Sequence, residues 1–180
     1  MKLFLTILLL TSSLFASKND IFRLYENKNY LQACKEGKSY LANSRNDESF
    51  VNLYAFSCLN ADWIDSLAVP ITMLKYSKES RNNASYFSII LMQKKLLYSA
   101  LIDDYKIEQL NLPTTKHVLS KVFDLYAQTS QNSPDKTYYF TDKDDKRTTY
   151  KLSLLKGSHI RKMVIEVYYD KILKDTHIYW

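Results

Sequence analysis

A two-residue pattern recurs along the first hundred positions of this chain at a nearly constant interval. A large apolar residue is followed three positions later by a small one, at Tyr30 and Ala33, Trp63 and Ser66, and Leu97 and Ala100. Successive occurrences are 33 and 34 residues apart. Residues three apart share one helix face, and a large side chain beside a small one allows a second helix to approach closely. The recurrence therefore predicts a series of helical hairpins that pack against one another.

Polar segments divide this region into the expected helices. Apolar residues recur at helical spacing around breaks at residues 26–29, 43–46 and 60–62. Pro70 should kink the helix expected from Trp63 to Leu74, or mark a later helix start. After a polar linker at residues 78–83, residues 84–109 should form one long helix or a hairpin turning near residues 93–95. Val118 to Tyr126 predict a last amphipathic helix.

The segment from Leu24 to Ala33 resembles the inter-helix turn of the tetratricopeptide repeat, a helix–turn–helix unit of about 34 residues. The resemblance covers residues 19–105. It departs from the family pattern because the usual turn glycine is replaced around Lys28 and Ala61, and the closing proline is missing. Unrelated helical hairpins with this spacing are the alternative.

This resemblance implies a short solenoid whose successive first helices line a concave binding surface. Tyr54, Phe56 and Tyr86 are the candidate partner-binding residues on that surface, with packing in the core as the alternative for each. The family resemblance also implies an adaptor that holds a protein or peptide partner and needs no cofactor.

The chain has two cysteines, Cys34 and Cys58. They fall on the second and third expected helices, which should be antiparallel neighbours, so the two side chains should lie at a similar level. One intramolecular disulfide is therefore predicted, with two buried free thiols as the alternative.

The composition changes after residue 130. Aromatic and branched residues alternate around a charged turn at residues 142–146, which is typical of a hairpin. Residues 131–180 thus predict a small antiparallel sheet of three or four strands beside a helical domain at residues 17–130. Within it, residues 160–172 fit either a strand or a helix.

Residues 1–16 have the pattern of a secretory signal peptide: Lys2, a short apolar core, and small residues before Ala16. Cleavage after Ala16 predicts a periplasmic or secreted protein with no membrane span, and an uncleaved anchor is the alternative.

The chemical motifs of enzymes are sparse. Two glycines are too few for a phosphate-binding loop, and His117, His159 and His177 lack the spacing of metal ligands. Basic and acidic residues alternate, which argues against a nucleic-acid surface. We therefore expect no catalytic, metal or cofactor site.

The predicted function is that of an exported, non-enzymatic interaction protein of the cell envelope. Two alternatives remain open. An envelope component could pair with a partner through an exposed sheet edge near Thr137 or Ile178. A hydrolase could assemble its site from His117, Asp103 and Asp104.

Overall fold

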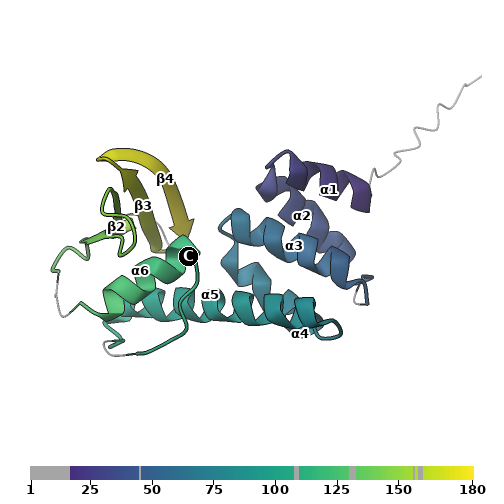
Figure 1. Cartoon of the computed structure of the whole chain (residues 1–180), viewed down its shortest axis with the longest axis horizontal. Helices are drawn as coiled ribbons and strands as arrows, with labels where there is room; N and C mark the ends of the chain where they lie inside the picture. Colours follow the sequence, from purple (N-terminus) through teal and green to yellow (C-terminus); the bar gives the residue numbers. More distant parts are fainter. Residues whose placement is uncertain (1–16, 45, 108–109, 130–132, 156, 158–159) are drawn as a thin grey trace, which may run out of the picture.

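The computed structural model describes residues 17–44, 46–107, 110–129, 133–155, 157 and 160–180. Helices form the first part of the chain and an antiparallel sheet the last part (Figure 1). The helices are α1 (Lys18–Glu26), α2 (Tyr30–Leu41), α3 (Glu48–Asn60), the 3₁₀ helix η1 (Ile64–Leu67), α4 (Ala68–Met73), α5 (Lys78–Asp103) and α6 (Val118–Ala127). The strands are β1 (Tyr138–Thr141), β2 (Thr148–Leu155), β3 (Lys162–Tyr169) and β4 (Ile172–Tyr179). The predicted fold class is confirmed.

The turns that follow α1 and α3 have the same geometry at positions 34 residues apart. Lys28 and Asp62 adopt left-handed backbone conformations, with φ of 60° and 61°. In both turns the N–H of the next residue donates to the carbonyl five positions back, at 2.9 Å. This bond closes a Schellman motif, in which the left-handed position usually holds glycine. A lysine and an aspartate therefore occupy the left-handed positions of two equivalent turns.

The segment around Pro70 is divided into two short helices. Pro70 is the third residue of α4, where its missing N–H breaks no helical hydrogen bond. The helix expected from Trp63 therefore starts later, at Ala68, as the alternative from the sequence predicts, and the 3₁₀ helix η1 precedes α4.

The polar linker predicted at residues 78–83 is wrong, because these residues form the first turns of α5. Ser77 caps the helix by accepting the Ser80 N–H at 3.0 Å. The preceding loop is fixed by the Glu48 carboxylate, which accepts the N–H groups of residues 75, 76 and 77 at 2.7–2.9 Å. From there α5 continues as one helix to Asp103, without a hairpin near residue 93.

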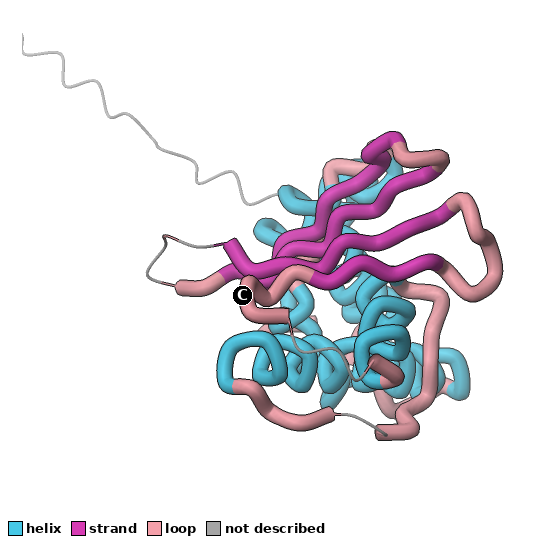
Figure 2. Tube along the Cα trace, turned by 90° about the vertical axis from the view of Figure 1, so that its left-hand side faces the viewer, coloured by secondary structure: helices cyan, strands magenta, loops and turns pink. Residues whose placement is uncertain are grey.

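The four strands form a meander in the order β1-β2-β3-β4. Residues 162–169 are therefore strand, which decides between the two alternatives for this segment. The meander lies against the helices (Figure 2), and across neighbouring strands Tyr138 pairs with Leu152 and Leu152 with Ile165. All three side chains are buried in the cluster that contains the apolar faces of α5 and α6. The sheet thus completes the main core.

Cys34 and Cys58 are joined in a disulfide, with 4.8 Å between their Cα atoms. The bond links α2 to α3, so it fastens the first hairpin to the second. Nearby, a Cβ atom on Gly37 would lie 2.9 Å from Tyr54 Cδ2, so the lack of a side chain allows α2 to approach α3.

The predicted signal peptide and the predicted domain boundary at residues 130–131 lie outside the described residues. Of the helices that the structure describes, none is long and apolar enough to cross a membrane.

Candidate functional site

A hollow of about 490 Å³ runs across α1, α3 and α5. We call it the α1–α3–α5 groove. The residues that line it are Lys18, Asn19, Phe22, Tyr25, Asp47, Ser49, Phe50, Asn52, Leu53, Phe56, Glu79 and Asn83. Its lining therefore combines aromatic rings with amide and charged groups.

The apolar side of the groove is supported by a small core of its own. Ile21, Ala33 and Phe50 are buried together between α1, α2 and α3, with Leu53 packed against them. Phe22 follows Ile21 on α1 and remains 49% exposed. A large aromatic side chain left half in solvent at the edge of a hollow is available to a partner.

An ion pair lies at the start of α1 and α3. Lys18 Nζ lies 2.6 Å from Asp47 Oδ2 and 5.4 Å from the centre of the Phe50 ring. Asp47 also caps α3 by accepting the Phe50 N–H at 3.1 Å. The hydrogen bond from Lys18, followed by that from the Phe50 N–H, lowers the pKa of Asp47. The pair therefore remains charged at neutral pH.

Two asparagine side chains connect α3 to α5 along the groove. Asn83 Nδ2 donates to Asn52 Oδ1 at 3.0 Å, and Asn52 Nδ2 donates to Ser80 Oγ at 3.1 Å. Each amide has two N–H donors and two acceptor lone pairs, so these bonds use only part of their capacity. The remainder could bind the main chain of an extended segment.

The structure does not bring the three predicted partner-binding residues together. Phe56 lines the groove and packs against Phe87, with 4.9 Å between ring centres. Tyr54 is buried in the core at 2% exposure. The two positions are two residues apart on α3, and such residues point to different sides of a helix. Tyr86 lines a different hollow.

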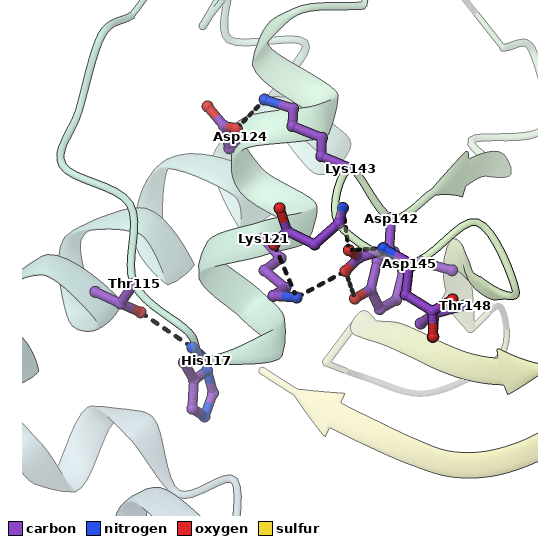
Figure 3. A network of polar contacts seen from close by, with 10 residues as sticks. Thr115, His117, Lys121, Asp124, Asp142, Lys143, Asp145 and Thr148 are labelled. Carbon is purple, nitrogen blue, oxygen red and sulfur yellow. Dashed lines mark hydrogen bonds and ion pairs between the residues drawn. The ribbon is translucent and has the colours of Figure 1, made fainter.

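That second hollow, of about 740 Å³, lies between α5, α6 and the β1–β2 turn. Its polar wall is a network centred on Asp142 (Figure 3). Asp142 Oδ2 accepts from Lys121 Nζ at 2.8 Å and from the Tyr150 hydroxyl, and its Oδ1 accepts two N–H groups of the turn. Burial alone would raise the pKa of Asp142, but these hydrogen bonds hold it well below its usual range. The network fixes the turn against α6.

A histidine pair lies where the sheet meets the helices. His177 Nδ1 is 2.9 and 3.0 Å from the two oxygens of Asp62. Burial alone would lower the pKa of His177, but Asp62 and then Asp175 outweigh it and raise it. Burial lowers the pKa of His117 to about 4, with Asp62 opposing this change and His177 adding to it. One histidine is thus stabilised as a cation and the other as a neutral ring.

Comparisons with protein-family models, with curated proteins and with solved structures find no match for this chain. Its function is therefore inferred from the chemistry of its own surfaces.

The three residues of the hydrolase alternative are held by different neighbours. His117 interacts with Asp62 and His177, Asp104 forms an ion pair with Lys136, and Asp103 accepts from Ser99. These contacts give no support to a shared site.

The titration of His117 predicts a loss of stability in acid. Its Nδ1 accepts the Leu119 N–H at 3.3 Å and so caps α6, which requires that nitrogen to be unprotonated. The pKa of His117 falls from 6.5 to about 4 on folding. The contribution of neutral His117 to the free energy of unfolding is therefore complete above pH 6.5 and is lost as the pH falls toward 4.

Replacement of His117 by asparagine keeps a capping acceptor and removes the titration. Between pH 6.5 and 4 the free energy of unfolding of wild type should fall by up to about 3 kcal/mol more than that of His117→Asn, as measured by urea unfolding. His177 acts in the opposite sense. Because its pKa is raised on folding, its contribution to stability is complete below pH 6.5 and is lost only as the pH rises through the pKa of the folded state. Parallel pH profiles for wild type and variant would contradict this assignment.

Proposed function

We propose that this chain is an exported, non-enzymatic interaction protein of the cell envelope, which holds an extended segment of a partner protein in the α1–α3–α5 groove. The observation that carries the proposal is that three helices, α1, α3 and α5, line one hollow. The tetratricopeptide resemblance implies this arrangement, and the equivalent turns at Lys28 and Asp62 support it.

The lining of the groove suits a peptide better than a small cofactor. Phe22 and Phe56 offer apolar contacts for side chains, while Asn52 and Asn83 offer donors and acceptors for a main chain. Alternating side chains and amide groups of an extended segment would use both kinds of contact. Because Lys18 and Asp47 neutralise each other, Glu79 supplies the remaining charge of the lining, and recognition would depend on shape, hydrogen bonds and this carboxylate.

Export is supported by two independent features. The first sixteen residues have the pattern of a signal peptide, and the Cys34–Cys58 disulfide is typical of proteins that fold in an oxidising compartment.

Pairing through the sheet is the second candidate, because β4 is an edge strand whose Ile172 and Leu173 are 61% and 48% exposed. The charged residues Lys174 and Asp175 follow on the same strand and would oppose unspecific pairing. An Ile172→Lys variant distinguishes the candidates, since it should abolish pairing at this edge and leave the groove unchanged.

The groove is tested with peptides selected on the full chain from a random display library. Phe22→Ala should weaken the binding of a selected peptide by about tenfold, as expected for an aromatic anchor, in fluorescence anisotropy. Leu31 on α2 is 42% exposed and outside the groove lining, so Leu31→Ala is the matched control and should have no effect. Equal losses in the two variants, or none in Phe22→Ala, would refute the proposal.

A further inference from the structure

The two tryptophans of the chain, Trp63 and Trp180, lie at one small pocket. The pocket has a volume of about 240 Å³ and lies between η1, α5 and the end of β4, apart from the α1–α3–α5 groove. We call it the two-tryptophan pocket. Its volume corresponds to about eight waters and is smaller than most sites for drug-sized ligands. It therefore suits a ligand of about one ring.

The indole rings are held in place from outside by lysines. Lys35 Nζ lies 5.7 Å from the centre of the Trp63 ring, and Lys162 Nζ lies 5.3 Å from the centre of the Trp180 ring. Such cation–π contacts orient an indole plane. Trp180 is nevertheless 45% exposed, so its ring is accessible to a ligand.

A buried ammonium group lines the same pocket. The Lys94 side chain is 2% exposed, and its Nζ donates to Asp65 Oδ1 at 3.0 Å and to the main-chain oxygen of Trp180. A lysine ammonium has three N–H donors. Nζ also lies 5.4 Å from the centre of the Tyr98 ring, so a ligand oxygen that enters the pocket would compete with this cation–π contact for the third N–H.

The charged residues that line the pocket are each paired, in part with residues outside its lining. Asp65 also binds Lys95 at 2.9 Å, and Asp62 is paired with His177. A cationic ligand would be placed close to the Lys94 ammonium, and an anionic ligand would meet two carboxylates. A neutral ligand rich in hydroxyl groups avoids both repulsions, because carboxylates accept from hydroxyls while Lys94 donates to them.

From these features we infer that the two-tryptophan pocket binds a pyranose ring of a neutral saccharide. The C–H groups on one face of a pyranose carry partial positive charge and pack against the electron-rich face of an indole. The ring hydroxyls then reach Asp62, Asp65 and the Lys94 ammonium. This site is separate from peptide binding in the groove and does not depend on it.

Tryptophan fluorescence reports on this pocket alone, because both tryptophans of the chain line it. The full chain is titrated with methyl pyranosides of glucose, galactose, mannose and N-acetylglucosamine up to their solubility limits. At least one should cause a saturable blue shift of the emission, as a sugar displaces water from the indoles. Tetramethylammonium chloride and sodium acetate, tested in the same way, should cause none.

Two lysine variants provide a matched pair, since Lys94 and Lys95 both bind Asp65 but only Lys94 lines the pocket. Lys94→Met should weaken sugar binding at least tenfold, whereas Lys95→Met should leave it unchanged. If Lys94→Met does not fold by circular dichroism, Trp180→Ala decides. Its side chain is 45% exposed, and the substitution keeps the main-chain oxygen that accepts from Lys94. In this variant the remaining Trp63 should lose its response. No saturable shift with any sugar, a shift only with the ionic probes, or an unchanged response in Trp180→Ala would overturn the inference.

Discussion

Replacing Cys34 and Cys58 together by alanine should lower the free energy of unfolding by about 3 kcal/mol. The disulfide closes a loop with a sequence separation of 24 residues, and the chain-entropy model gives a stabilisation of this size for such a loop. The bond connects α2 to α3, and α3 is one of the three helices that line the groove.

Urea unfolding of the oxidised wild type and the double variant measures this difference. Dithiothreitol should destabilise wild type by a similar amount and have no effect on the double variant, which is the control for unspecific effects of the reductant. Alkylation of the unfolded, unreduced wild type should label no thiol. Equal unfolding midpoints for the oxidised wild type and the variant would show that the bond does not stabilise the fold.

Asp142→Ala should destabilise the protein by about 3 kcal/mol, because the change removes the acceptor of several hydrogen bonds in a buried place. The Asp142 side chain is 4% exposed, and its loss leaves the Tyr150 hydroxyl and two turn N–H groups without this acceptor. Lys121 is 31% exposed and can be solvated in part, which limits the cost.

Asp144→Ala is the matched control. Asp144 lies two residues further along the same turn, 3.9 Å from Lys121, but its side chain is 87% exposed. A surface pair of this kind contributes at most about 0.5 kcal/mol. Guanidinium unfolding at pH 7 compares the two, and equal effects would contradict the role given to Asp142.

The same network predicts a response to acid. Folding lowers the pKa of Asp142. Its contribution to the free energy of unfolding is therefore complete above the ordinary carboxyl pKa and is lost as the pH falls below about 4. The stability of Asp142→Ala should therefore change less than that of wild type below this pH.

The helices and the sheet could be predicted because their signals are local. Apolar residues at helical spacing, polar breaks and alternation in the strands each extend over a few residues. The apolar pattern does not predict the first turns of α5, because residues 78–83 are polar on every side, although Ser77 is a capping residue placed directly before them. Capping is a weaker signal than an apolar stripe, and here it marked the helix start more accurately.

The candidate site was predicted less well, because it depends on contacts between distant residues. The Asn52–Asn83 hydrogen bond joins positions 31 residues apart, and the His177–Asp62 contact joins positions 115 apart. No local pattern reports such pairs. Tyr54 and Phe56 are separated in the same way, because Tyr54 packs against Gly37 on α2 whereas Phe56 packs against Phe87 on α5.

The most direct test of the proposed function is photo-crosslinking in cells from single positions inside and outside the groove. A benzophenone amino acid replaces Phe22 or Asn83 in the groove, and Leu31 or Met92, which are 42% exposed and outside the groove lining, as controls. We predict that both groove positions crosslink to the same partner protein and that an excess of a selected peptide prevents this crosslinking. The control positions should not capture that partner. Crosslinks to that partner from Leu31 or Met92 alone, or crosslinks that the peptide does not reduce, would contradict binding in the α1–α3–α5 groove.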